Sequence, residues 1–227
     1  MKTTKPTFNL LSIGHRGVGK TVFLAGSYIE LHRQNRHAQQ QLWFDCQQQQ
    51  VQEKIDSLLG YVSHKGDYPP PTMKIKDFCF SLKQRRFLGS QTLCYFRWLD
   101  IPGEICNFQN PDFRAMVSNS DGCCVFIDAY ALLNNSNTYL KYLEEIIKQV
   151  TAIASLAFLH DCEYPFVIIL TKCDLLETLL TQQIQEFLLP LFACLDTVEA
   201  NYQTFYSSIP IDRAPNSATL KPTGAAN

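Results

Sequence analysis

This 227-residue sequence lacks an excess of charge of either sign, paired cysteine motifs and long apolar runs. Its 20 Lys and Arg residues are balanced by 21 Asp and Glu residues, so it has no basic excess of the kind that nucleic-acid backbones attract. The charge balance therefore gives no indication of a nucleic-acid partner. No apolar run approaches the roughly 20 residues of a membrane-spanning helix, and no myristoylation or prenylation signal is present. No membrane anchor is expected either.

The cysteines and histidines carry no metal or redox signature. None of the nine cysteines belongs to a CxxC pair, and the five histidines show no ligand spacing to one another or to cysteine. The odd cysteine count and the absence of a signal peptide indicate a reducing, cytoplasmic location. Hydrophobic residues make up 46% of the chain, which is enough for a full core.

Apolar segments of strand length alternate with helical patterns along the chain. A short strand at 8–13 leads into a glycine-rich loop, and apolar residues then recur at helical spacing over 20–32. The runs GCCVFI at 122–127 and PFVIIL at 165–170 are typical of buried parallel strands, and a helical stripe at 139–157 separates them. This alternation predicts an α/β fold with a mostly parallel sheet covered on both faces.

Four further elements are expected. Segments 73–82 and 92–99 are rich in β-branched and aromatic residues and are separated by a polar turn, which predicts an antiparallel hairpin. A helix is expected at about 181–195, and 202–206 is the last strand candidate.

The expected domain spans residues 1–208 and contains an insertion at about 35–70. Glutamine is a fair helix former, so the glutamine-rich stretch at 33–60 is interpreted as one more helix, followed by an extended proline loop. The tail at 209–227 has no apolar period and is expected to be irregular.

The glycine-rich loop satisfies every fixed position of the Walker A pattern. It consists of Gly14, His15, Arg16, Gly17, Val18, Gly19, Lys20 and Thr21, with Val22 following. Such a loop turns successive backbone N–H groups toward phosphates at a helix N-terminus. Lys20 can reach the β- and γ-phosphates, and the Thr21 hydroxyl can ligate magnesium. The alternative is a chance glycine turn, which the flanking strand and helix make a poor explanation.

Asp100 and Gly103 follow the second strand of the expected hairpin in the sequence DIPG. An Asp at a strand end can hold magnesium, and the Gly103 N–H can donate to a γ-phosphate. The alternative reading is an ordinary Asp-x-Pro-Gly turn.

Thr171, Lys172 and Asp174 directly follow the apolar run at 165–170, in the sequence TKCD. The Asp carboxylate can accept from guanine N1–H and from its exocyclic amine, whereas adenine has no matching donor pair. The Lys172 stem can lie over the face of the base. The alternative is a solvated strand-to-helix loop.

In this order, GHRGVGKT, DIPG and TKCD resemble the Ras-like GTPases of the translation-factor-related P-loop class, over residues 8–208. The resemblance implies a three-layer P-loop NTPase fold whose mostly parallel sheet has one antiparallel edge strand. TKCD departs mildly from the commoner NKxD, and the final helix of the family is missing or shortened. The opening motif and the long first switch are most similar to bacterial double-GTPase-type GTPases.

The resemblance also implies roles for residues outside these motifs. Thr72 lies where the first switch of the family carries the Thr that closes over magnesium and γ-phosphate. The alternative interpretation is a Thr in a turn that opens the following strand. Ser207 and Ser208 approximate the loop that backs guanine. Glu104 replaces the usual Gln that orients water, so hydrolysis is expected to be slow without a partner's Arg. Arg16 could act as an internal helper.

The predicted function is a GTP-binding switch that hydrolyses GTP with Mg²⁺ and signals to a protein effector or GTPase-activating partner. The alternatives are an inactive nucleotide-binding scaffold and a P-loop ATPase or small-molecule kinase. The candidate catalytic residues are Lys20, Glu104 and Thr72. The candidate metal ligands are Thr21, Thr72 and Asp100. The candidate nucleotide-binding residues are Gly14 to Val22, Gly103, Thr171, Lys172, Asp174, Ser207 and Ser208.

Overall fold

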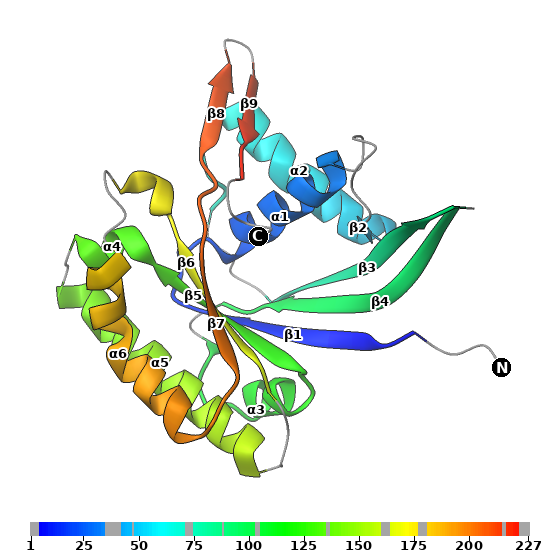
Figure 1. Cartoon of the computed structure of the whole chain (residues 1–227). Helices are drawn as coiled ribbons and strands as arrows, with labels where there is room; N and C mark the ends of the chain where they lie inside the picture. The colour runs from blue at the N-terminus through cyan, green and yellow to red at the C-terminus, as the bar shows by residue number, and fades with distance from the viewer. Residues whose placement is uncertain are drawn as a thin grey trace.

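The computed structural model describes residues 5–34, 42–46, 48–70, 75–87, 89–102, 105–134, 137–159, 164–176, 181–214 and 217–222. Within these residues the chain has a mixed α/β fold built on one curled, seven-stranded sheet (Figure 1). The strand order is β2-β3-β4-β1-β5-β6-β7. The strands are β1 (Thr7–Ile13), β2 (Leu42–Cys46), β3 (Lys76–Arg86), β4 (Gly89–Asp100), β5 (Gly122–Asp128), β6 (Phe166–Thr171) and β7 (Tyr202–Tyr206).

Most neighbouring strands in the sheet are parallel, as the alternating pattern predicts. β1 pairs in parallel with β4 and β5, and β6 pairs in parallel with β5 and β7. The expected antiparallel hairpin is β3–β4. The expectation of one antiparallel edge strand is wrong. The antiparallel strand β3 lies inside the sheet, because β2 pairs antiparallel with β3 and forms the edge.

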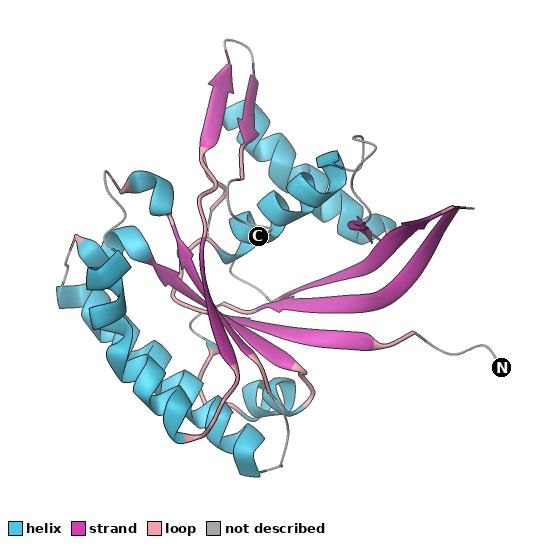
Figure 2. Cartoon of the chain, viewed as in Figure 1, coloured by secondary structure: helices cyan, strands magenta, loops and turns pink. Residues whose placement is uncertain are grey.

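Helices cover both faces of the sheet (Figure 2). On one face, α3 (Pro111–Ser118), α5 (Asn137–Leu159) and α6 (Thr181–Thr197) pack on the apolar side chains of β1, β5 and β6. On the other face, α1 (Lys20–Gln34) and α2 (Gln49–Lys65) pack on the aromatic residues of β3 and β4. A short helix, α4 (Ala129–Leu133), follows β5 directly.

The insertion differs from the single helix expected at 33–60. Residues 35–41 and 47 lie outside the described residues, whereas 42–46 form strand β2 and 49–65 form helix α2. Phe44 of β2 packs its ring against Phe80 and Phe96 at centroid distances of 6.0 and 5.8 Å. The strand forms because β3 offers a pairing partner, which local helix propensity does not register.

The tail also differs from the irregular segment expected at 209–227. Strands β8 (Ile211–Ala214) and β9 (Ser217–Leu220) form an antiparallel hairpin that packs against α2. Ile209 and Leu220 are buried in a cluster with Ala25, Ile29 and Val62. Among the described residues, no helix follows β7, and this hairpin leaves the sheet on the α1–α2 side instead (Figure 1).

No helix in the described part of the chain is both long and apolar enough to cross a membrane.

Candidate functional site

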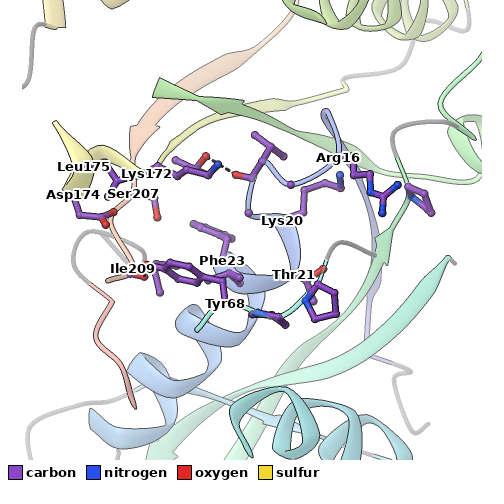
Figure 3. A pocket seen from close by; sticks show the side chains of 18 residues that line it. Arg16, Lys20, Thr21, Phe23, Tyr68, Lys172, Asp174, Leu175, Ser207 and Ile209 are labelled. Carbon is purple, nitrogen blue, oxygen red and sulfur yellow. Dashed lines mark hydrogen bonds between the residues drawn. The ribbon is translucent and has the colours of Figure 1, made fainter. Parts of the chain in front are cut away.

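The loops after four parallel strands meet around one cavity of about 300 Å³ (Figure 3). These loops follow β1, β4, β6 and β7, whose carboxyl ends lie at the same edge of the sheet. This edge is where open α/β sheets generally bind ligands. The lining residues are Arg16 to Phe23, Tyr68 to Pro70, Pro102, Thr171, Lys172, Asp174, Leu175, Ser207 and Ile209.

The Walker A loop has a backbone that only glycine adopts easily. Gly14 has φ +144°, and a Cβ atom there would lie 2.6 Å from the Phe126 carbonyl oxygen. Because Gly14 has no Cβ, the loop can turn tightly against β5 at the end of β1. The loop then ends where α1 begins at Lys20, so the N-terminal end of this helix lies at the cavity.

Lys20 lies inside the turn of this loop. Its residue is only 7% exposed, and its Nζ donates to the Gly14 carbonyl oxygen at 2.9 Å. An ammonium held beside the N-terminus of α1 makes this end of the cavity a positively charged pocket. Such a pocket suits an anion with several oxygens, such as a phosphate.

Thr21 and Asp100 meet beside the phosphate loop, although they are 79 positions apart. The Thr21 hydroxyl donates to Asp100 Oδ2 at 2.5 Å, and Asp100 is fully buried. A hydroxyl and a carboxylate oxygen are the donors that Mg²⁺ prefers. Among the described residues, no three His, Cys, Asp or Glu side chains group as a metal centre. The Thr21 hydroxyl and the Asp100 carboxylate are by their chemistry suitable to hold a magnesium ion together with phosphate and water.

Thr171 joins the end of β6 to the glycine-rich loop. Its hydroxyl donates to the Val18 carbonyl oxygen at 2.6 Å and lies 3.2 Å from the Ile127 carbonyl oxygen. The hydroxyl is buried and already engaged with backbone. The structure therefore gives Thr171 a positioning role next to the cavity.

Lys172 is held by an acidic residue that sequence reasoning missed. Its Nζ lies 2.5 Å from Oδ2 of Asp128, the last residue of β5. Asp128 also caps α4, because its Oδ1 accepts from the Ala131 N–H at 2.9 Å. Lys172 has φ +58°, so the chain turns sharply after β6 and its side chain extends along the cavity wall. An Asp directly after a buried strand was the available sequence signal.

Asp174 and Ser207 complete this end of the cavity. Asp174 is exposed at the rim, as a carboxylate that reads a ligand must be. Ser207 is buried: its N–H donates to Leu170 O at 2.7 Å, and its carbonyl accepts from Cys173 N–H at 3.2 Å. The loops after β6 and β7 are thereby fixed to each other. The adjoining Ser208 does not belong to the described cavity lining.

Tyr68 and Ile209, neither of which the sequence singled out, form an apolar wall of the cavity. Figure 3 shows them with Phe23, on the side opposite Lys172. The Tyr68 hydroxyl donates to the Ile209 carbonyl oxygen at 2.9 Å. Burial, and to a lesser extent the charge of Asp174, raises the pKa of the Tyr68 hydroxyl. An aromatic residue beside three prolines was the only local signal.

Other predicted site residues lie elsewhere. Gly14 and His15 are not part of the described lining, and the His15 ring stacks on Tyr142 of α5 with centroids 3.6 Å apart. Thr72, Gly103 and Glu104 lie outside the described residues.

No protein-family model matches this chain, and no curated protein has a significant match to it.

Proposed function

We propose that this chain is a GTPase of the Ras-like P-loop class that binds GTP with Mg²⁺ and acts as a slow molecular switch. One observation carries the proposal. Residues 16–21 of the Walker A loop and the Lys172–Asp174 pair border a single cavity although they are far apart in sequence, and the buried Asp100 accepts a hydrogen bond from the Thr21 hydroxyl beside it. The cavity volume of about 300 Å³ is at the lower limit of small-molecule sites.

At the phosphate end, backbone N–H groups from Gly17 to Thr21 surround the triphosphate. Lys20 moves from the Gly14 carbonyl to the β- and γ-phosphates, where its charge offsets the charge that develops during hydrolysis. Thr21 and Asp100 hold the magnesium ion. When bound, this ion would supply positive charge that offsets the charge of the phosphates.

At the base end, Asp174 selects guanine. Its carboxylate accepts two hydrogen bonds from the guanine edge, and adenine would leave it unpaired. The Lys172 stem lies along one face of the base, while Asp128 holds its ammonium in place. A polar site built to pair a donor discriminates strongly against analogues that lack it.

Hydrolysis is slow because Glu104 occupies the position after the switch glycine. A carboxylate beside the γ-phosphate is electrostatically unfavourable, and a partner's Arg would be worth about 10³–10⁵ in rate. By the resemblance to Ras-like GTPases, Thr72 and Gly103 are the residues that would contact the γ-phosphate, and loss of that phosphate would release both segments to signal to a protein effector. Single-turnover hydrolysis by Glu104→Ala tests the role of Glu104, and an unchanged rate would remove it from the mechanism.

Calorimetric titration with GTP, GDP and ATP in magnesium tests the proposal directly. We expect preference for guanine nucleotides, which Asp174→Ala abolishes. Asp212→Ala is the matched control, because Asp212 is an exposed carboxylate on β8 outside the cavity lining. Equal affinity for GTP and ATP, or a preference that survives Asp174→Ala, would defeat the guanine assignment and favour a P-loop ATPase.

The presence of Glu104 where Ras-like GTPases usually have Gln also favours a second candidate function. In this function the chain is a scaffold that binds nucleotide without hydrolysing it. Multiple-turnover phosphate release separates the two functions. Release by the wild-type chain that Lys20→Ala abolishes supports the GTPase, whereas tight nucleotide binding without release, even with candidate partners, supports the scaffold.

A further inference from the structure

A second cavity, of about 270 Å³, lies between α1 and the sheet. α1 lines it with the residues at positions 23, 24, 27, 28 and 31, a spacing that places them on one face of the helix. The sheet lines it with Leu10 of β1, Phe44 of β2, Phe80 of β3, and Phe96 and Trp98 of β4. Among the described residues, Phe23 alone lines both this cavity and the candidate nucleotide cavity, so the two are separate sites.

The walls of this cavity are largely aromatic and carry no formal charge. The Phe44 ring lies 5.8 Å from Phe96 and 6.0 Å from Phe80 by centroid, and the Tyr28 ring lies 6.0 Å from Phe80. The described lining contains no Asp, Glu, Lys, Arg or His. A charged ligand would lose its hydration there without meeting an opposite charge. The lining therefore favours a neutral ligand.

Two polar groups of the lining lack a partner. Ser27 lies on the helical wall and Trp98 on the sheet wall, and Trp98 is only 8% exposed. Among the described residues, neither Ser27 Oγ nor Trp98 Nε1 has a hydrogen-bond partner, although both atoms are buried. A buried donor without a partner is costly, and an indole N–H can only donate. The Ser27 hydroxyl can donate as well, so an acceptor would satisfy either group.

Tyr28 supplies the other polar group of the lining side chains, but it is already engaged. Its hydroxyl donates to Gln52 Oε1 at 2.7 Å, so its ring lines the cavity while its oxygen is bonded to α2. Ser27 and Trp98 are therefore the groups that would orient a ligand.

We propose that this cavity binds a small, neutral aromatic molecule that carries one carbonyl-type acceptor. An apolar cavity of about 150 Å³ holds benzene, so one of about 270 Å³ holds a ring with a short substituent. The ring of the ligand packs among the phenyl groups of the walls, and its oxygen accepts from Ser27 and Trp98.

Size and chemistry select this occupant over water and over a protein segment. One water, which fills about 30 Å³, could pair with Ser27 and Trp98 but would leave most of the apolar walls uncovered. A neutral ring covers these walls and removes their apolar surface from water. An α-helix with its side chains is about 10–12 Å across, which is too wide for a cavity of this volume.

Calorimetric titration of the full chain without nucleotide tests the proposal with two probes of nearly the same shape. Acetophenone carries a ketone oxygen, and α-methylstyrene has a CH₂ group in its place. Ser27→Ala should weaken acetophenone binding about five-fold and leave α-methylstyrene binding within about two-fold, because only the ketone loses a hydrogen bond. Ser27→Leu fills the cavity and should abolish binding of both probes.

The indole N–H of Trp98 gives a second readout. The chain contains two tryptophans, so Trp43→Phe leaves Trp98 as the only indole. In the NMR spectrum of this variant, the Trp98 Nε1–H proton should move downfield on addition of acetophenone, as expected for a new hydrogen bond. α-Methylstyrene, which has no acceptor oxygen, should not cause this shift.

Ser155→Ala is the matched control, because the Ser155 hydroxyl bonds only the Thr151 carbonyl oxygen within α5. This variant should bind both probes like the wild type. Failure of acetophenone to bind the wild-type chain would overturn the proposal. Equal effects of Ser27→Ala on the two probes, or an unmoved Trp98 Nε1–H proton, would do the same. None of these readouts involves a nucleotide, so they do not depend on the proposed GTPase function.

Discussion

The hydroxyl of Tyr68 donates a hydrogen bond to the Ile209 carbonyl oxygen at 2.9 Å and joins segments 141 positions apart. Tyr68 follows the inserted helix α2, and Ile209 precedes the C-terminal hairpin. A second bond supports the same junction, because Arg213 of β8 donates to the Gly66 carbonyl oxygen at 2.9 Å. The insertion and the tail thus build one wall of the candidate cavity together.

Replacing Tyr68 separates the contribution of its ring from that of its hydroxyl. Tyr68→Ala removes the aromatic wall and should weaken GTP binding about ten-fold, because base–aromatic contacts are worth about 1–3 kcal/mol. Tyr68→Phe keeps the ring. Because Tyr68 is 42% exposed, water can replace the lost bond, so affinity should change by less than about three-fold. Calorimetry on both variants measures this. Equal losses would assign the effect to the hydroxyl instead.

Asp128→Asn tests whether the Asp128 carboxylate positions Lys172. Asn still caps α4, so the free energy of unfolding should change little, but the charge that holds Lys172 is lost. Lys172 is 38% exposed and solvent screens the pair, so we expect a modest, about three- to ten-fold loss of GTP affinity. The matched control is Asp212→Asn, at an exposed ion pair on the hairpin that should leave affinity unchanged. A loss of stability without a loss of affinity would make the pair purely structural.

Thr21→Val tests the proposed magnesium site. Valine keeps the shape of Thr21 and removes the hydroxyl that meets Asp100. The magnesium concentration needed for tight GTP binding should rise at least 10–100-fold, the range seen for groups that support metal ligands. GTP binding in EDTA should be unaffected. Thr151→Val is the control, because that hydroxyl only bonds a carbonyl within α5. An unchanged magnesium requirement for Thr21→Val would remove Thr21 from the site.

The sequence predicted those parts of the site that short motifs encode. GHRGVGKT and TKCD each follow an apolar strand, and parallel strands place their carboxyl ends at one edge, so convergence was expected. The structure brings Lys20, Asp100 and Asp174 to that edge. The Tyr68–Ile209 wall could not be predicted in this way, because it depends on a contact between distant segments with no motif of their own.

The two errors in secondary structure have the same cause. β2 lies beside glutamines that favour a helix locally, yet pairing with β3 and burial of Phe44 decide its conformation. β8 and β9 are only four residues each, and they form where Leu220 can pack against α2. The pairing partner of β2 and the packing partner of Leu220 are both distant in sequence, so local sequence patterns do not predict these contacts.

Gly14→Ala should destabilise the fold as well as the phosphate loop. Its Cβ would lie 2.6 Å from the Phe126 carbonyl oxygen, and φ +144° is unfavourable for alanine. We expect a loss of about 2–4 kcal/mol in the free energy of unfolding, from strain and overpacking together. Gly17→Ala is the matched control: φ is +76°, but nothing lies within 4 Å of the added atom. Its cost should be about 1 kcal/mol. Chemical denaturation measures both, and equal costs would contradict the close approach of β5.

Cys173 should make stability and labelling depend on pH in the alkaline range. Burial raises the pKa of its thiol from 9.0 to about 11, and its Sγ donates to the Leu170 carbonyl oxygen at 3.3 Å. Because thiolates are the reactive form, alkylation of Cys173 should be slow at neutral pH and keep rising beyond pH 9. The folded pKa is the higher one, so its stabilising effect is complete below pH 9 and is lost between pH 9 and about 11. The wild type should therefore lose free energy of unfolding relative to Cys173→Ser over that interval, and a constant difference would show that Cys173 ionises equally in both states.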